Sequence, residues 1–156
     1  GWGLIDARSA ALEHIRDTSF VILTRGWNLF ALPVDKVTST RQIPTLLPIY
    51  WYNGTTYVDV DSLYPGHGYW VYSTADTIFE VIGSRIDSLS INLQRGWNLI
   101  GGLSRKTFRW DFPFTYDIFP FIYNYEECLF NVTTIIPPSC GVWLFSLKDT
   151  VLTLTH

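Results

Sequence analysis

The sequence predicts an all-β protein of two tandem, similar repeats, each with about five antiparallel strands, preceded by a short N-terminal helix. Three observations support this prediction. The pentapeptide Arg-Gly-Trp-Asn-Leu occurs at residues 25–29 and again at 95–99. Apolar and polar residues alternate around both copies, with the period of a β-strand. Hydrophobic residues make up 47% of the 156 residues and charged residues 16%, so the chain has enough apolar material to fold around a core.

The repeat extends beyond the pentapeptide. Tyr-Asn at residues 52–53 returns at 123–124, and Gly-Tyr-Trp-Val-Tyr at 68–72 returns as Gly-Val-Trp-Leu-Phe at 141–145. The offset between copies grows slightly along the chain, as small loop insertions would produce. Self-similarity of this kind is the signature of a repeated structural unit.

These matches divide the chain into three parts. We expect an N-terminal helical segment at residues 1–18, a first β repeat at 19–85 and a second at 88–156. In the first part, apolar side chains fall at helical spacing and Asp6 stands at a helix N-cap position. The link between the repeats is short and strand-like, so we expect them to pack as one rigid unit.

Within each repeat, the first predicted strand is long and bends at Gly26 or Gly96, because glycine accepts positive φ without a Cβ clash. Asn53 and Gly54 lie between two strand-like runs, which is a strong hairpin signal. A second predicted hairpin joins the Gly-Tyr-Trp-Val-Tyr strand to residues 77–81 and has a counterpart in the second repeat.

The Gly-Trp-Asn-Leu strand, followed by Pro33, an aromatic hairpin at 50–53 and Pro-Gly-His-Gly-Tyr-Trp at 65–70, resembles a repeat of bacterial and archaeal secreted or S-layer-type surface proteins. The second copy departs from that pattern, with Gly-Leu at 102–103 and Pro-Ser-Cys-Gly-Val-Trp at 138–143. The resemblance covers both repeats. It implies an extracellular or cell-surface location and an architectural role without a defined reaction.

The repeated motif supplies ten residues for which we expect a structural role: Gly26, Trp27, Asn28, Leu29, Trp70, Gly96, Trp97, Asn98, Leu99 and Trp143. The four tryptophans occupy equivalent strand positions, so we expect them in the buried core. Asn28 and Asn98 are expected to bond backbone groups at the bends. A catalytic asparagine would not need to occur in both copies.

Other aromatic residues lie less regularly near the predicted hairpins, so we expect some of them to be exposed: Tyr50, Trp51, Tyr52, Tyr57, Trp110, Tyr116, Tyr123 and Tyr125. Residues 108–125 are more aromatic than their counterpart at 43–52, so core demand shared by both copies does not explain the excess. Exposed apolar patches mark interaction sites. We therefore predict an interaction surface that includes Trp51, Trp110, Phe112, Phe114, Tyr116, Phe119 and Phe121.

Cys128 and Cys140 are the only cysteines, and in a secreted protein their spacing favours an intramolecular disulfide over two free thiols. No Cys-x-x-Cys pair is present, which argues against zinc ribbons and thioredoxin-like chemistry. Asn131 begins an Asn-Val-Thr sequence and is a candidate for N-glycosylation. Asn53 matches the same pattern, but a hairpin turn explains it equally well.

Catalytic candidates are few. His67 could act as a ligand or base, and Asp59 with Asp61 could form a carboxylate pair, but a loop histidine and solvated carboxylates are much commoner interpretations. No histidines have metal-ligand spacing. We therefore expect no enzyme activity, no metal and no cofactor.

A net charge of −3 without a basic run argues against nucleic acid as a partner. No stretch approaches the roughly 18 apolar residues that membrane insertion requires. We predict a non-enzymatic extracellular structural or adhesive module that makes protein contacts through exposed aromatic hairpins. Its partner would be another copy, as in a surface assembly or filament, or the rest of a larger surface polypeptide. A carbohydrate-binding module is the alternative, because rings on a β face also stack on sugars.

Overall fold

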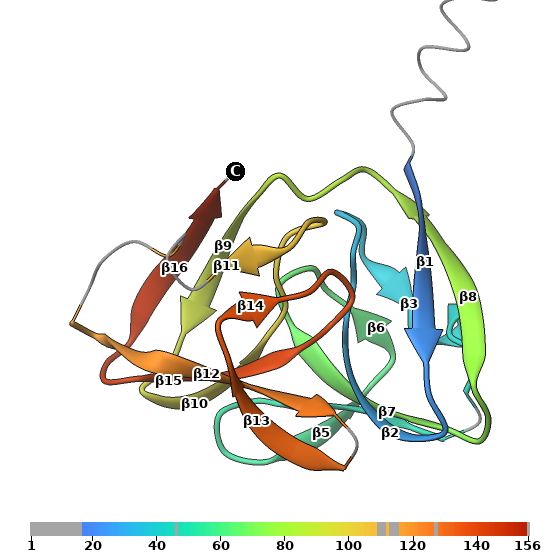
Figure 1. The fold of residues 1–156 in the computed structure, drawn as a ribbon, viewed down its shortest axis with the longest axis horizontal. Helices are drawn as coiled ribbons and strands as arrows, with labels where there is room; N and C mark the ends of the chain where they lie inside the picture. The colour runs from blue at the N-terminus through green and yellow to red at the C-terminus, as the bar shows by residue number, and fades with distance from the viewer. Residues whose placement is uncertain (1–16, 46, 109–111, 113–115, 127, 156) are drawn as a thin grey trace, which may run out of the picture.

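The computed structural model describes residues 17–45, 47–108, 112, 116–126 and 128–155 (Figure 1). Within these residues the regular structure consists of sixteen β-strands and a single turn of 3-10 helix, η1 (Thr40–Gln42). The all-β class predicted from the sequence is confirmed. The helix predicted within residues 1–18 lies outside the described residues, except that Asp17 and Thr18 belong to the first strand.

Residues 17–83 form the first half of the molecule. Its strands are β1 (Asp17–Leu23), β2 (Gly26–Ala31), β3 (Thr38–Ser39), β4 (Ile49–Tyr52), β5 (Tyr57–Val60), β6 (Ser62–Leu63), β7 (Gly68–Ser73) and β8 (Thr77–Gly83). This is more than the five strands expected per repeat. The additional strands include β3 and β6, which have two residues each and are too short for alternation to reveal.

Residues 88–155 form the second half. Its strands are β9 (Ser88–Leu93), β10 (Gly96–Ile100), β11 (Thr107–Phe108), β12 (Ile118–Glu126), β13 (Leu129–Thr133), β14 (Ile135–Ile136), β15 (Val142–Ser146) and β16 (Thr150–Thr155). The C-terminal strand β16 therefore corresponds in order to β8.

Strand pairing follows the same order in both halves. The first half has a four-stranded sheet in the order β2-β7-β4-β5 and the pairs β1-β8 and β3-β6. The second has β10-β15-β12-β13 with the pairs β9-β16 and β11-β14. In Figure 1 both four-stranded sheets lie at the lower end of the molecule, and the strands β1, β8, β9 and β16 rise above them. Whether the halves are copies of one unit stays a prediction.

The predicted bends are present at Gly26 and Gly96, whose φ angles are +104° and +105°. At each bend the chain passes from a two-stranded sheet into a four-stranded sheet, so β1 pairs with β8 while β2 pairs with β7. The hairpin predicted between β7 and β8 is wrong for the same reason, as is its counterpart between β15 and β16, because in each case the two strands belong to different sheets. Asp76 Oδ1, between β7 and β8, accepts a hydrogen bond from Arg25 N–H at 3.0 Å.

The two motif asparagines hydrogen-bond the backbone at the bends. Asn28 Oδ1 accepts from Thr24 N–H at 3.0 Å, and Asn28 Nδ2 donates to Thr24 O at 2.8 Å and to Gly26 O at 3.0 Å. Asn98 makes the same set of bonds in the second half, to the N–H and C=O of Gln94 and to Gly96 O. Each side chain thereby satisfies backbone groups that the bend removes from the sheet.

Each half has its own apolar core between its sheets. In the first half Phe30, Leu63 and Val71 are at most 1% exposed, and in the second Ile122 and Leu144 are fully buried. The Asn53-Gly54 hairpin joins β4 to β5 as predicted, and Asn53 Oδ1 accepts from two backbone N–H groups of the turn.

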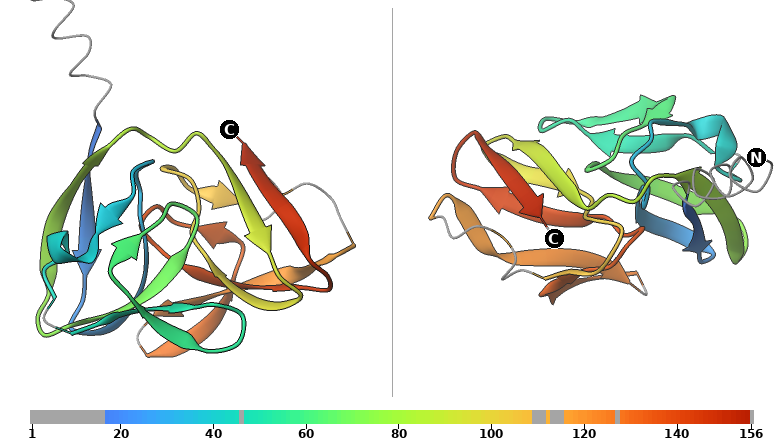
Figure 2. Two further views of the ribbon diagram at one scale, coloured as in Figure 1. Left: turned by 180° about the vertical axis from the view of Figure 1, so that it is seen from behind. Right: turned by 90° about the horizontal axis from the view of Figure 1, so that it is seen from above.

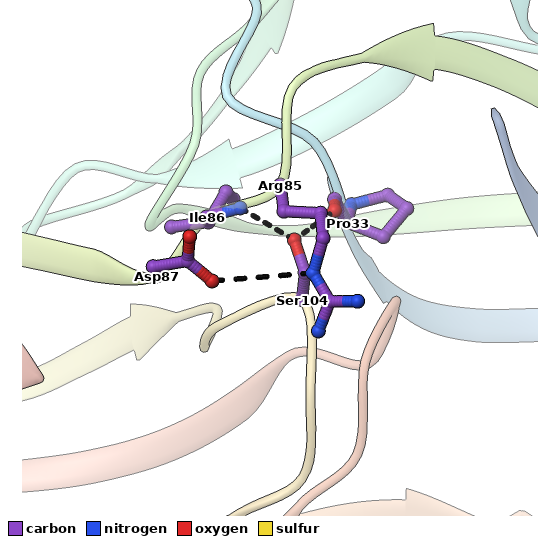
Figure 3. Close-up of polar contacts among 5 residues, drawn as sticks. All are labelled: Pro33, Arg85, Ile86, Asp87 and Ser104. Carbon is purple, nitrogen blue, oxygen red and sulfur yellow. Dashed lines mark hydrogen bonds and ion pairs between the residues drawn. The ribbon is translucent and has the colours of Figure 1, made fainter. Parts of the chain in front are cut away.

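Residues 84–87 connect the halves and are hydrogen-bonded to both (Figure 3). Ser104 Oγ accepts from Ile86 N–H at 2.6 Å and donates to Pro33 O at 2.5 Å. Ser104 N–H donates back to Ile86 O at 3.1 Å, and Asp35 N–H donates to Ser84 O at 2.8 Å. The connection is therefore an ordered part of the fold.

The halves lie side by side (Figure 2) and meet where the ends of β2 and β10 contact the other half. Ala31 N–H donates to Ser139 O at 3.1 Å, and Gly101 N–H donates to Gly66 O at 2.9 Å. Isolated bridges pair Phe30 with Cys140 and His67 with Ile100. These contacts come in corresponding pairs, which form the junction between the halves. At its centre a Cβ on Gly141 would lie 3.2 Å from Gly68 Cα.

Candidate functional site

The expectation that the motif tryptophans lie in the core is wrong for Trp27 and Trp97, which are each 43% exposed. Trp70 and Trp143 are only partly buried. The strands that carry them are apolar on both faces, so alternation alone could not indicate the core side. The core face of the β2-β7 pair carries Phe30, Tyr69 and Val71, while the tryptophans occupy the opposite face.

Ten aromatic side chains on the four-stranded sheets form a continuous exposed surface, which we call the aromatic face: Trp27, Tyr50, Tyr52, Tyr57, Trp70, Trp97, Tyr123, Tyr125, Phe130 and Trp143. The surface is hollowed into two clefts. The first cleft, of about 450 Å³, is lined by Trp27, Tyr50, Tyr57, Trp70, Tyr125 and Phe130. The second cleft, of about 500 Å³, is lined by Tyr52, Tyr57, Trp97, Tyr123, Phe130 and Trp143.

The two clefts are built alike. Trp27 and Trp70 meet edge to face with centroids 6.2 Å apart, and Trp97 and Trp143 do so at 6.4 Å. The floor of each cleft is completed by a cross-strand neighbour, because Tyr50 pairs with Trp70 and Tyr123 pairs with Trp143. Equivalent positions of the two halves therefore supply equivalent walls.

Each cleft also needs the opposite half. In the first cleft Trp70 contacts Tyr125 at 4.9 Å and Phe130 at 6.2 Å, both from the second half. In the second cleft Trp143 contacts Tyr52 at 5.3 Å and Tyr57 at 6.5 Å, both from the first half. The clefts are therefore composite sites at the junction of the halves.

Only a few kinds of side chain line the two clefts. Among the described residues, those lining them are tryptophan, tyrosine and phenylalanine, with no charged side chain. Within the same part of the chain, the indole N–H groups of the four tryptophans make no hydrogen bond to the protein. The clefts are thus lined by aromatic rings whose polar groups are indole N–H and phenol hydroxyl groups.

The predicted interaction surface is only partly exposed. Tyr116 is 83% exposed, and Phe119 and Phe121 are also exposed. The prediction is wrong for Phe112, which is 5% exposed and packs in the core of the second half. Trp110 and Phe114 lie outside the described residues.

Phe119 is connected to the aromatic face. Its ring lies 6.3 Å from that of Phe145, which in turn lies 5.2 Å from Trp97. By strand pairing, Tyr50, Tyr52 and Tyr57 of the first half correspond to Tyr123, Tyr125 and Phe130. The sequence match of residues 52–53 to 123–124 is therefore wrong by two residues, and the correct register would have found the face.

A second groove, of about 550 Å³, lies on the first half and includes Trp51, Asp59, Asp61, Tyr64, His67 and Tyr69 in its lining. The His67 ring stacks on Trp51 with centroids 4.6 Å apart and an interplanar angle of 3°. Tyr69 Oη accepts from Tyr64 N–H at 2.7 Å and lies 3.4 Å from His67 Nδ1. Burial raises the pKa of Tyr69 to about 12, so its hydroxyl stays protonated and can donate to His67 Nδ1.

Burial lowers the pKa of His67, which predicts a pH dependence of stability. The folded state favours the neutral ring, whereas the unfolded chain takes up a proton near pH 6.5. The free energy of unfolding should therefore be highest above pH 6.5, fall as the pH drops from 6.5 towards the lower pKa of the folded state, and level off below that pKa. Urea unfolding at pH 7.5 and pH 5.5 measures this loss.

A His67→Phe variant is the control, because it keeps a ring against Trp51 but cannot take up a proton. Its loss of stability between pH 7.5 and pH 5.5 should be smaller than that of the wild type. Equal losses in the two proteins would contradict the assignment to His67.

The predicted disulfide is not present, and both cysteines are free thiols. Cys128 is exposed in the β12–β13 turn with φ 63°, while Cys140 is held at the junction of the halves by its bridge to Phe30. Burial, followed by the charge of Glu126, raises the pKa of the Cys140 thiol. Asn131 is exposed on β13, where its Nδ2 donates to Leu129 O at 3.3 Å, and its glycosylation stays a prediction.

Among the described residues, no group of three or more His, Cys, Asp or Glu side chains is placed to hold a metal ion. None of the helical structure in that part of the chain is long and apolar enough to span a bilayer. Comparisons with protein-family models, with curated proteins and with solved structures found no match. The resemblance to surface-protein repeats therefore stays an expectation.

Proposed function

We propose that the chain is a non-enzymatic extracellular structural or adhesive module that contacts other proteins through its aromatic face. The observation that carries this proposal is the clustering of ten exposed or partly exposed rings on one surface. Tryptophan and tyrosine are enriched at the centres of protein interfaces, and exposed apolar patches of this kind mark interaction sites. We also infer that the two halves are tandem repeats of one unit, which their common strand order supports.

The composition of the face favours recognition over catalysis. A catalytic cleft needs an acid, base or nucleophile beside its substrate, and the lining of both clefts offers only tyrosine hydroxyls as titratable groups. The rigid rings lose little conformational entropy when a partner binds. Phe119 and Phe121 extend the surface along β12, which supports self-association as one mode of contact.

Carbohydrate binding is the alternative, because exposed rings also stack on sugars. Sugar hydroxyls need both donors and acceptors, and among the described lining residues the phenol oxygens are the only side-chain acceptors. Protein contact therefore has the stronger support.

Array binding tests this proposal. The chain would be applied to an array of secreted proteins that includes the chain itself, and to a glycan array, in parallel with a Trp27→Ala/Trp97→Ala double variant. We expect protein binding that falls at least tenfold in the double variant, because both clefts lose an exposed wall. A Phe20→Ser/Ile78→Ser variant, altered on the exposed side of the β1–β8 pair, is the matched control and should bind normally.

Two outcomes would contradict the proposal. Binding to glycans alone, with competition by free sugar, would favour the carbohydrate module. Protein binding that is equal in the wild type and the double variant would place the contact away from the aromatic face.

A further inference from the structure

We propose that each of the two clefts binds a proline-rich polypeptide segment in the polyproline II conformation, so that one chain binds two such segments. This inference rests on the proposed function and names the chemistry of its partner. It follows from three properties of the clefts: their hydrogen-bonding groups, their ring geometry and their duplication.

The tryptophans of the clefts add hydrogen-bond donors that suit a ligand rich in acceptors, beside phenol hydroxyls that can donate or accept. The indole N–H groups of Trp27, Trp70, Trp97 and Trp143 can only donate, and they have no partner within the described residues. A proline residue has a backbone carbonyl but no N–H. A proline-rich segment can therefore pair with these donors without burying an unsatisfied N–H group of its own, which would cost stability of the complex.

The geometry of the rings suits the shape of such a segment. In each cleft two tryptophans of the lining meet at right angles, Trp27 with Trp70 at 90° in the first cleft and Trp97 with Trp143 at 90° in the second. Two rings at right angles form a corner with two flat walls, against which a pyrrolidine ring can pack. Aromatic-lined grooves are a recurring recognition mode for polyproline II segments, which are already extended and lose little entropy on binding.

The absence of charged side chains in the clefts argues against an acidic peptide as the ligand. The described lining residues are uncharged, so an acidic peptide would find no counter-charge there. An ordinary β-strand ligand would add to a free sheet edge, whereas the clefts lie over the faces of the sheets. A neutral ligand rich in rings and carbonyl groups matches the lining best.

Because there are two similar clefts, we expect one chain to bind two ligand segments. Equivalent walls in the two clefts imply the same ligand chemistry, and both clefts share Tyr57 and Phe130. A partner with two proline-rich segments joined by a linker of suitable length would gain avidity from binding both. The two clefts would thus allow one chain to bind a partner in which the proline-rich segment is repeated.

Calorimetric titration with a peptide of ten prolines tests the inference, with a ten-residue Gly-Ser peptide as the control ligand. We expect two peptides to bind per wild-type chain and the Gly-Ser peptide not to bind. Trp27→Ala should remove the first site and Trp97→Ala the second, so that each single variant binds one peptide. The Phe20→Ser/Ile78→Ser variant should retain both sites.

Folding is checked independently. Circular dichroism and urea unfolding of each variant show whether a lost site reflects a lost wall or a lost fold. Tyr57→Ala provides a second test, because Tyr57 is 50% exposed and lines both clefts. It should weaken both sites at least tenfold without unfolding the protein.

Wild-type protein that does not bind the proline peptide, or binds it equally after Trp27→Ala and Trp97→Ala, would overturn the inference. If the array still shows protein contacts that depend on the same tryptophans, only the ligand class is wrong and the proposed function stands. Saturable sugar binding that is lost in these variants would overturn both.

Discussion

A Gly68→Ala substitution is expected to lower the free energy of unfolding by about 1 to 3 kcal/mol, because there is no room for a methyl group at this position. A Cβ on Gly68 would lie 2.9 Å from Ile100 O and 2.9 Å from Leu99 Cγ, both in the other half. The carbonyl belongs to backbone that is paired with His67 and cannot rotate away. The halves would have to separate slightly, which weakens the contacts at their junction.

Urea unfolding of the wild type and Gly68→Ala measures this loss. Gly141→Ala is the matched comparison from the other half, because its Cβ would have looser contacts of 3.1 to 3.3 Å with Leu29, Gly68 and Phe30. We expect a smaller loss for Gly141→Ala than for Gly68→Ala. Unchanged unfolding midpoints in both variants would contradict the close approach of the halves.

Ser104→Ala is expected to cost about 1 to 3 kcal/mol of unfolding free energy, since it leaves a buried donor without a partner. The Ser104 hydroxyl joins Ile86 N–H to Pro33 O, as Figure 3 shows, and the Ile86 side chain is 1% exposed. Without the hydroxyl, the Ile86 N–H has no hydrogen-bond acceptor and the Pro33 carbonyl loses a donor. The connection between the halves would then be held by fewer bonds.

Chemical unfolding together with hydrogen exchange at the Ile86 amide tests this prediction. The Ile86 amide should exchange faster in Ser104→Ala than in the wild type. Ser84→Ala is the control, because Ser84 is exposed and contributes its backbone carbonyl, which the substitution keeps. A Ser104→Ala variant as stable as Ser84→Ala would show that the bond adds nothing.

Much of the fold could be predicted because its signals are local. Positive φ at Gly26 and Gly96 and the Asn53-Gly54 turn follow from backbone preferences that depend on few neighbours. Which strands pair with one another was harder to predict from the sequence. A polar corner at residues 73–76 is consistent with a hairpin, and only tertiary contacts decide that β7 and β8 join different sheets.

The candidate site was harder to predict than the fold. Trp27 and Leu29 lie on the same face of β2, yet Trp27 is exposed and Leu29 is buried. Leu29 is covered by the other half, where it lies beside Gly141. Strand periodicity assigns residues to faces but does not say which face, or which part of a face, another element covers. The disulfide prediction failed for a related reason, because spacing along the chain does not fix the distance between Cys128 and Cys140.

The bridge between Phe30 and Cys140 has a consequence for the folding kinetics of the chain. It joins the second strand to a residue close to the C-terminus, so the loop that it closes contains most of the molecule. Contacts of such long sequence separation form late, because their closure entropy must be offset by structure that already exists. Each half can assemble its own sheets first, and the aromatic clefts then form when the halves dock. The fluorescence of the cleft tryptophans should consequently report the last step of folding, after the secondary structure of each half is complete.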